Sequence, residues 1–354
     1  MCRNHHLLLW GSLLLLLTAS CAKRPDIHNG KLLIPDKTSK LELQGTHSTD
    51  LMYTGCGGMI IAHQNEAIIT DPFYTGQGLM RVPLGVRINP KNTRRVFDSI
   101  RQKLIDPHQI NAALIAHAHV DHLLDLPYLL NNDMLNRQLQ VIGHRSVYCT
   151  IRSFMPAGTS FTDTLNTWVN VSPHIRVMAL PSSHAPHTRN RLFLQGTTCP
   201  NGIKGFKTPL SSTSLFKWKE GGTVSFLIDL LDTTGKTQTR LYIQSSASQA
   251  PDGFPPAELL AERPVDVAFI CVASFENVNN YPEKLLQYLN PAKVVLIHWE
   301  DFFRKDFMEH PKIIRATSTK KLIERLQQFY QFSSQKLLAE RVYMPKPYTV
   351  FHLR

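Results

Sequence analysis

Short hydrophobic runs separated by polar turns dominate the chain after about residue 41. Two such runs, at 59–63 and 67–70, flank the polar turn 64–66, which predicts a β-hairpin. Wholly apolar runs are typical of strands buried on both faces, and they cover residues 112–116, 265–272 and 293–297. Further strands are expected at 50–54, 140–143, 175–180, 223–229, 240–244 and 348–353.

Amphipathic segments alternate with these strands. Residues 93–105 place Val96, Phe97 and Ile100 on one face, which predicts a helix that ends before Pro107. Helices are also expected at 283–289 and 319–332. Strand pairs come first, strands alternating with helices follow, and the order repeats over two halves. This pattern predicts an α/β fold with two sheets packed face to face and helices outside.

The N-terminus has the pattern of an export signal. Arg3 precedes an apolar run at 7–17, which is too short for a bilayer span of roughly 20 residues but suits a signal peptide. Small residues follow and lead to Cys21, so the segment resembles a bacterial lipobox in which this cysteine is lipidated. Thr18 stands where a lipobox usually has Leu, so an ordinary cleaved signal or an uncleaved anchor stays open as an alternative.

The chain is therefore expected to divide into three parts. Residues 1–20 form the signal peptide, residues 21–44 form a polar tether for the lipid anchor, and residues 45–354 form one domain. On this interpretation the protein is an exported lipoprotein. It is anchored to a membrane and faces the periplasm or the cell exterior.

Composition limits the other classes of function. Hydrophobic residues make up 43% of the chain, as in folded globular proteins. The net charge is +12, but the basic residues are spread along the chain without a block that aromatic residues interleave, so no nucleic-acid partner is expected. The cysteines of the domain are widely spaced and form no zinc-binding pair; one disulfide is allowed, but the sequence does not pair them. They are Cys56, Cys149, Cys199 and Cys271.

The strongest chemical signal is the hexapeptide at 117–122, with the sequence His-Ala-His-Val-Asp-His. It follows the apolar strand at 112–116 directly. In an extended segment, side chains two residues apart point the same way, so His117 and His119 can reach one metal ion. Asp121 and His122 lie beyond, where the chain must turn, and can face a second ion.

This hexapeptide resembles the H-x-H-x-D-H signature of the metallo-β-lactamase-fold superfamily. Three further positions match the family pattern in order. Asp71 ends an early strand after a glycine-rich turn, His184 follows a later strand with His187 as its rival, and His298 ends a late strand. The resemblance covers about residues 45–350. It implies a four-layer αββα sandwich.

The resemblance also implies the roles of these residues. Asp71 would hold the loop that bears the histidines. Two zinc ions would be bound, one by His117, His119 and His184, the other by Asp121, His122 and His298. Asp121 would be the catalytic residue that orients the nucleophile.

One position departs from the family pattern. Many members place an aspartate that bridges both metals after the second hairpin, but Ser246 stands there in this chain. Asp229 and Asp232 lie at the other strand of that hairpin and are not expected to replace it. Two zinc ions remain the prediction, with one as the alternative if the second set binds weakly.

The resemblance implies a zinc-dependent hydrolase that uses a metal-bound hydroxide on a small ester, lactone or lactam-type substrate. Segments 76–101 and 189–222 are expected to wall the pocket. Three alternatives stay open. The chain could be a phosphodiesterase for a phospholipid or sugar phosphate, which Ser246 argues against, or a non-catalytic metal-binding lipoprotein. A nuclease is disfavoured by the export signal.

Overall fold

The computed structural model describes residues 39–41, 49–79, 81–187, 194–332 and 338–353. The predicted signal peptide and Cys21 lie outside the described residues and stay predictions. Most of the predicted tether, 21–44, lies outside them too, but Ser39–Leu41 forms a strand. Within the described residues, no helix combines the length and apolar character that a membrane crossing requires.

The fold is built on two mixed sheets. The first has eight strands in the order β1 (Ser39–Leu41), β15 (Val350–Leu353), β2 (Thr49–Gly55), β3 (Gly58–His63), β4 (Glu66–Thr70), β5 (Ile110–Ile115), β6 (Gln140–Gly143) and β7 (Ser160–Thr162). The second has seven, in the order β14 (Val342–Tyr343), β13 (Lys293–Ile297), β12 (Val267–Cys271), β11 (Thr237–Gln244), β10 (Thr223–Leu231), β9 (Ile175–Ser182) and β8 (Trp168–Ser172).

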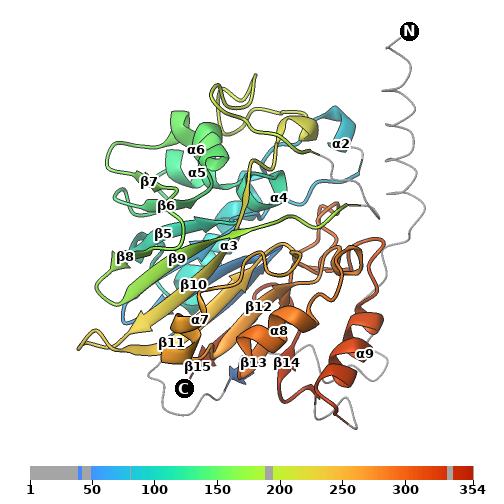
Figure 1. Ribbon diagram of the computed structural model, residues 1–354. Coiled ribbons are helices and arrows are strands. Elements are labelled where there is room, and N and C mark those ends of the chain that lie inside the picture. Colours follow the sequence, from blue (N-terminus) through green and yellow to red (C-terminus); the bar gives the residue numbers. More distant parts are fainter. Residues whose placement is uncertain (1–38, 42–48, 80, 188–193, 333–337, 354) are drawn as a thin grey trace.

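Helices form the outer layers. The first half of the chain contributes α2 (Arg81–Leu84), α3 (Pro90–Lys103), α4 (Val120–Leu123), α5 (Leu126–Asn131) and α6 (Arg145–Ile151). The second half contributes α7 (Ala257–Glu262), α8 (Glu283–Leu289) and α9 (Thr319–Phe329). In Figure 1, α5 and α6 lie on one side of the strands and α7, α8 and α9 on the other. The expected αββα sandwich is confirmed.

Three apolar cores hold the four layers together, and side-chain alternation along the strands assigns residues to them. In β2, Leu51 and Tyr53 face the core between the two sheets, whereas Met52 faces the core under the helices of the first half. In β10, Phe226 packs between the sheets and Leu227 packs under the helices of the second half. Because these strands are buried on both faces, their central residues, 51–53 and 226–228, are apolar on both faces.

Each sheet contains a group of parallel strands. Strand β4 pairs in parallel with β5, and β11, β12 and β13 pair in parallel in the second sheet. Strand β9 has the direction of β11, because both are antiparallel to β10. The carboxyl ends of these strands therefore meet at one edge of the sandwich.

Most expected elements are confirmed, and β13 and α8 have the expected bounds. The helix expected at 93–105 begins earlier, at Pro90, because the Asn89 side chain accepts a hydrogen bond from the Lys91 amide and caps it. Strands β7 and β8 and helix α6 were not expected. The two strands lie at sheet edges and are only partly buried, so they lack the apolar alternation of a buried strand.

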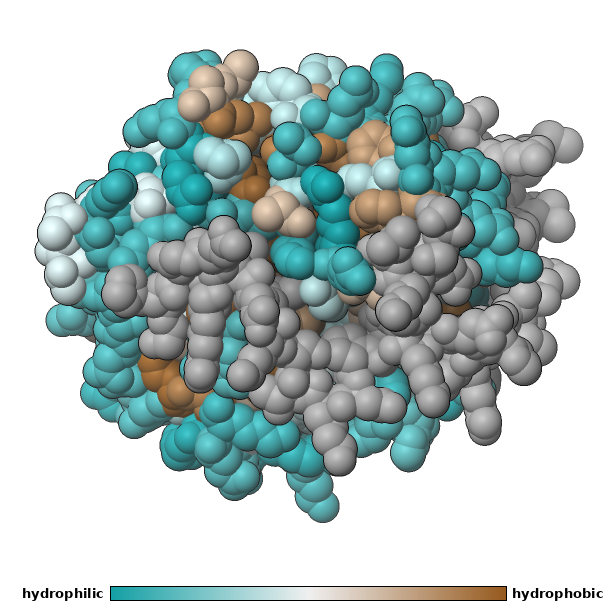
Figure 2. All heavy atoms as spheres, turned by 90° about the horizontal axis from the view of Figure 1, so that it is seen from below, coloured by the Kyte–Doolittle hydropathy of each residue, from teal (hydrophilic) through white to brown (hydrophobic). Residues whose placement is uncertain are grey.

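The surface is largely polar. Figure 2 shows one face on which hydrophilic residues predominate between smaller apolar areas. Among the described residues, the large hydrophobic side chains that are exposed are Leu84, Leu165 and Leu210. They lie far apart in the sequence.

A buried ion network crosses the second sheet. Asp229 of β10 stands directly opposite Arg176 of β9 and Arg240 of β11. Its carboxylate accepts hydrogen bonds from Arg176 at 2.7 Å and from Arg240 at 2.6 Å. Asp229 and Arg240 are both fully buried. Removing one charge would leave the other without its partner in a low-dielectric interior.

We expect Asp229→Asn to lower the free energy of unfolding by about 3–5 kcal/mol, because Arg240 would remain buried and charged. Urea denaturation measures this change. The matched control is Asp133→Asn, which removes an ion pair with Arg137 in which both side chains are more than half exposed. The control should leave the denaturation midpoint nearly unchanged. An equal effect of both substitutions would contradict the account of the network.

Candidate metal centre

The predicted ligands lie at the carboxyl ends of three strands. His117 and His119 follow β5, and Asp121 and His122 follow on the short helix α4. His184 lies beyond the end of β9, and His298 follows β13 directly. The structure thus brings all six residues together from segments far apart in the sequence, in two groups of three.

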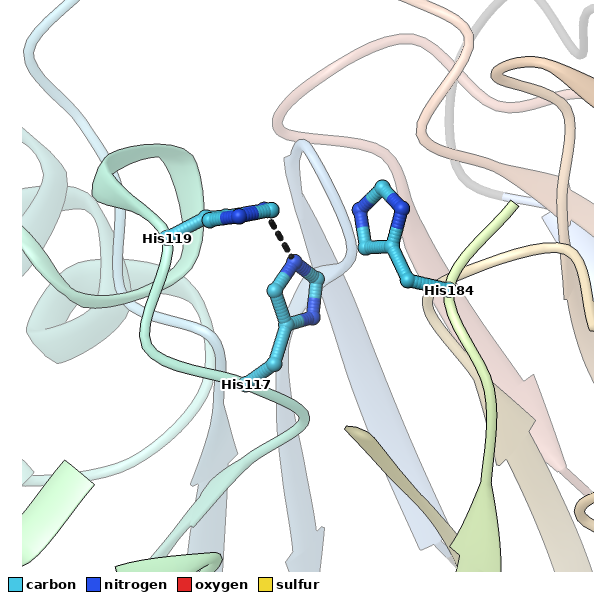
Figure 3. Close-up of side chains that lie close together, drawn as sticks. All are labelled: His117, His119 and His184. Carbon is cyan, nitrogen blue, oxygen red and sulfur yellow. Dashed lines mark hydrogen bonds between the residues drawn. The ribbon is translucent and has the colours of Figure 1, made fainter. Parts of the chain in front are cut away.

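The first group consists of three imidazoles that point toward one another (Figure 3). His117 Nε2 lies 2.9 Å from His119 Nδ1. The His184 ring centroid lies 4.8 Å from that of His117 and 4.9 Å from that of His119. His184 Nδ1 donates to the Ala185 carbonyl at 2.7 Å, which leaves its Nε2 lone pair for a ligand.

The second group forms a nearly regular triangle. His298 Nε2 lies 3.2 Å from both His122 Nε2 and Asp121 Oδ2, and His122 Nε2 lies 3.5 Å from that oxygen. Two ligands at tetrahedral zinc, each about 2.05 Å from the ion, are about 3.3 Å apart. The triangle therefore has the dimensions of one face of a tetrahedral site.

The chemistry of these donors fits a cation. Burial and the neighbouring imidazoles lower the pKa of His117 and His119 well below the usual value, and burial lowers that of His184. A neutral imidazole carries a proton on only one of its two ring nitrogens, so the other nitrogen presents a lone pair. Within the described residues, the remaining nitrogens His117 Nδ1 and His119 Nε2 have no hydrogen-bond partner. A metal ion would satisfy the lone pairs that converge here.

The carboxylates set a different electrostatic balance in the second group. Burial alone would raise the pKa of Asp121, but His122 and His298 hold it well below its usual range. Burial would lower the pKa of His122, but the carboxylates of Asp71 and Asp121 raise it. Asp121 is therefore ionised at neutral pH, as a metal ligand must be.

Asp71 supports the hexapeptide from the end of β4. Its Oδ1 accepts a hydrogen bond from the Ala116 amide at 2.8 Å, and its Oδ2 lies 3.1 Å from His122 Nδ1. The glycine-rich turn approaches closely, since a Cβ on Gly57 would lie 3.1 Å from Asp71 Oδ2 and 2.9 Å from Ser245 Oγ. Gly57 also has a φ of 82°, which favours glycine. Asp71 thus fixes both the loop backbone and one ligand ring.

His298 is held by a second support, which involves Tyr53 and Glu300. Its backbone has a φ of 56°, a conformation uncommon outside glycine, and its amide donates to the Tyr53 hydroxyl at 3.0 Å. Tyr53 in turn donates to the carboxylate of Glu300 at 2.8 Å. Glu300 is fully buried, and burial raises its pKa to about 7.

No carboxylate occupies the position of the usual bridging aspartate among the described residues. The Ser246 hydroxyl accepts a hydrogen bond from the Ala185 amide at 3.3 Å. Asp229 is committed to its arginine partners, and Asp232 accepts hydrogen bonds from Thr234 and Lys236 in an exposed turn. Neither residue replaces the bridging ligand.

A cavity of about 230 Å³ opens over the ligands. Asp121, His119, His184 and His298 contribute to its floor. One wall comes from the segment after β9 that was expected to contribute, through residues such as Leu215 and Phe216. The expectation for 76–101 is not confirmed, because none of the described residues of that segment lines the cavity. The other wall comes instead from 302–303 and 314–316.

His187 also lines the cavity. Its ring stacks on that of His184, with centroids 4.7 Å apart, and lies 5.7 Å from the centroid of His119. Burial lowers the pKa of His187 to about 3, and His184 adds to this effect. The sequence left His184 and His187 as rivals for one role; the structure places His184 in the ligand triad and His187 beside it.

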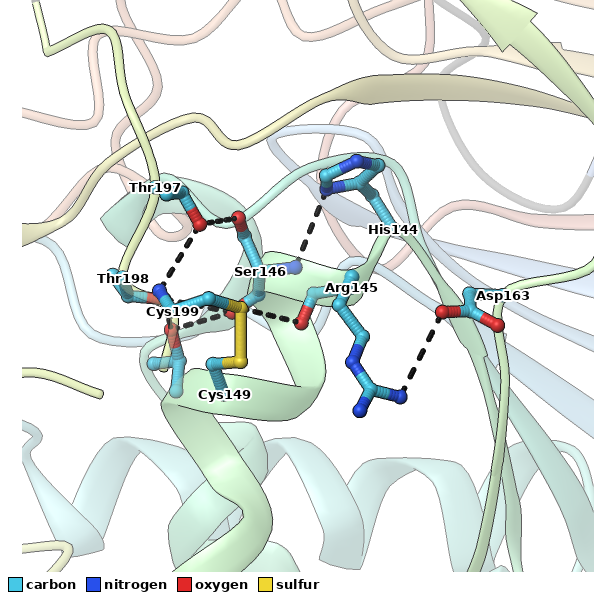
Figure 4. The surroundings of a disulfide bond; sticks show 9 residues. His144, Arg145, Ser146, Cys149, Asp163, Thr197, Thr198 and Cys199 are labelled. Carbon is cyan, nitrogen blue, oxygen red and sulfur yellow. Dashed lines mark hydrogen bonds and ion pairs between the residues drawn. A yellow bond between two sulfur atoms is a disulfide. The ribbon is translucent and has the colours of Figure 1, made fainter. Parts of the chain in front are cut away.

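A disulfide bond anchors the segment after β9 that forms one wall of the cavity. Cys149 of α6 is bonded to Cys199, and nearby hydroxyls of Ser146 and Thr197 are hydrogen-bonded at 2.7 Å (Figure 4). The bridge ties the segment that leads to Leu215 and Phe216 to the first half of the sandwich. The sequence allowed one disulfide without pairing the cysteines, because their partners are set only by the fold.

We expect Asp71→Asn to weaken zinc binding by roughly 10–100-fold, because the amide would no longer orient His122 as a carboxylate does. Competition with a chromophoric chelator measures the affinity. Asp98→Asn, on the exposed side of α3, is the matched control and should bind zinc as the wild type does. Undiminished affinity in Asp71→Asn would contradict this role.

Glu300 should make the stability of the metal-free protein depend on pH. Its folded pKa of about 7 exceeds an unfolded value of about 4.3, so the folded state holds the proton more tightly. The stability of the wild type relative to Glu300→Gln should therefore fall by up to about 3 kcal/mol as pH rises from 4.5 to 7.5. Denaturant titrations of both proteins measure the difference. A difference that does not change with pH would contradict it.

No family model and no curated protein matches the chain by sequence. Solved structures resemble it at low identity. The metallo hydrolase Igni18 from Ignicoccus hospitalis has 13% identity and a TM-score of 0.49, over 87% of this chain and 99% of its own. The metallo-β-lactamase fold protein YhfI from Bacillus subtilis has 10% identity and a TM-score of 0.47, over 86% of this chain and 100% of its own. An isothiocyanate hydrolase from Delia radicum gut bacteria has 11% identity and a TM-score of 0.47, over 85% of this chain and 98% of its own. On its own layer order, strand topology and ligand placement, the chain has the fold of the metallo-β-lactamase superfamily.

Proposed function

We propose that the chain is a zinc-dependent hydrolase that acts on a small ester, lactone or lactam-type substrate. The observation that carries the proposal is that two ligand triads lie together and that four of their residues, His119, Asp121, His184 and His298, line one cavity. A purely structural metal site is closed by four protein ligands, whereas each triad leaves a coordination position unfilled by the chain. Non-catalytic metal storage would have no need of a cavity above the ligands.

The proposed ligands divide between two ions. His117, His119 and His184 would hold the first, and Asp121, His122 and His298 the second. When bound, zinc supplies Lewis acidity and lowers the pKa of a coordinated water to about 7. Since Ser246 provides no bridging carboxylate, the affinity for the second ion would depend on its three ligands Asp121, His122 and His298.

Asp121 would act on the nucleophile as well as on the metal. Its carboxylate borders the cavity and is kept ionised by His122 and His298, so it can accept a hydrogen bond from the attacking water and orient it. The apolar residues above it would limit access of bulk water to the reacting carbonyl. No serine or cysteine nucleophile is required by this arrangement.

We further propose that the protein is exported and anchored through Cys21. The signal-type apolar run and the small residues before Cys21 support export. The disulfide between Cys149 and Cys199 supports it independently, because such bonds persist in oxidising compartments. Basic residues spread over the sequence give no separate support for a nucleic-acid partner.

Asp121→Asn should lower kcat for ester or lactone hydrolysis by roughly 10²–10⁴-fold, since the variant loses the carboxylate that orients water. Hydrolysis of p-nitrophenyl acetate, γ-butyrolactone and a chromogenic cephalosporin measures the activity. A chelator should abolish it, and zinc should restore it. Asp98→Asn is the matched control and should retain wild-type turnover. A zinc-loaded wild type that hydrolyses none of these compounds would favour the non-catalytic alternative.

A further inference from the structure

The walls of the cavity have a chemical character distinct from its floor. The floor is formed by ligand-type side chains, whereas the walls are apolar. The apolar wall residues are Leu194, Leu215, Phe216, Phe302, Phe303 and Ile314. They come from the segment after β9 and from the loops after β13, so two separate parts of the chain supply one hydrophobic surface.

Few of the described lining residues are charged. Apart from the histidines, Asp121 and Arg315 are the charged residues among the described part of the lining. Arg315 Nε lies 3.1 Å from Oδ2 of the fully buried Asp301, so its positive charge is largely balanced by that carboxylate. An anionic group placed against these walls would lose its hydration without gaining an opposite charge from them.

We infer that the substrate is a neutral carboxylic ester or lactone whose acyl group is apolar and lies against these walls, with its carbonyl at the ligand floor. This inference rests on the proposed hydrolase function and names its substrate class. In the reaction, the oxygen of water bonds to the carbonyl carbon and the bond from that carbon to the alkoxy oxygen breaks. The alcohol leaves with one proton of the water, and the acid releases the other.

The volume of the cavity limits the acyl group. A cavity of about 230 Å³ has room for a short acyl chain above the ligands. Each methylene that is buried against apolar walls should raise kcat/KM roughly fourfold until the cavity is filled.

Phe303 is the wall residue best suited to a test. It is partly buried and packs against Phe302, with the two rings tilted and their centroids 4.5 Å apart, whereas the Phe302 centroid also lies 5.6 Å from that of the ligand His298. A change at Phe303 therefore alters the wall with less risk to the floor. Phe254 is the matched control, because it is also partly buried but packs on Tyr288 away from the cavity lining.

The zinc-loaded protein should be assayed with p-nitrophenyl acetate, butyrate and hexanoate, and with bis(p-nitrophenyl) phosphate as an anionic diester. From acetate to butyrate, kcat/KM should rise by roughly 15-fold, and the phosphate diester should be the poorest substrate. Phe303→Ala should reduce the butyrate-to-acetate ratio at least threefold, and Phe254→Ala should leave it unchanged. Phe303→Leu, which keeps the apolar wall, should retain most of the ratio.

Binding of acetate and hexanoate, as product acids, gives a readout that does not require turnover. Calorimetry should find hexanoate bound more tightly than acetate in the wild type and less so in Phe303→Ala. Ester hydrolysis that is independent of chain length, or faster cleavage of the phosphate diester, would overturn the substrate class and leave a metal-dependent hydrolase. Failure to hydrolyse any ester or diester would overturn both the substrate class and the proposed function.

Discussion

The lone pairs of buried imidazoles that face one another at 2.9–3.2 Å are the constraint around which the centre is built. Burial and the neighbouring imidazoles keep His117 and His119 neutral, so the ring nitrogens that face one another there can offer lone pairs to a metal ion. The strand ends of both sheets supply the donors, so the packing of the two sheets decides whether the donors meet. The three apolar cores that fix this packing therefore also fix the geometry of the metal centre.

Two buried side chains, Asp71 and Tyr53, connect the strands of the packed sheets to the ligand residues. Asp71 joins the end of β4 to the hexapeptide and to His122, while Tyr53 on β2 of the first sheet reaches the amide of His298 at the end of β13 in the second. The Tyr53 contact is formed between the two sheets. A shift of one sheet against the other would thus displace His298 from Asp121 and His122, and the second ligand group would lose its triangular form.

Local sequence predicted the interior of this fold better than its margins. Strands β5, β12 and β13 are buried on both faces and carry unbroken apolar runs, so their pattern was unambiguous. The hexapeptide could be assigned because its ligand residues are adjacent in sequence. The cavity wall at 302–303 and 314–316, the Tyr53–Glu300 pair and the Cys149–Cys199 bridge arise from contacts between distant segments, which no local spacing encodes.

The most direct test is the zinc content of the purified chain, wild type beside His184→Ala and His298→Ala, by atomic emission spectroscopy. The two ligand triads predict two zinc ions per wild-type chain and about one in each variant. A single ion that survives in His298→Ala would contradict the second site and leave a mononuclear centre on the three histidines. A wild-type chain that holds no zinc would contradict the metal centre itself.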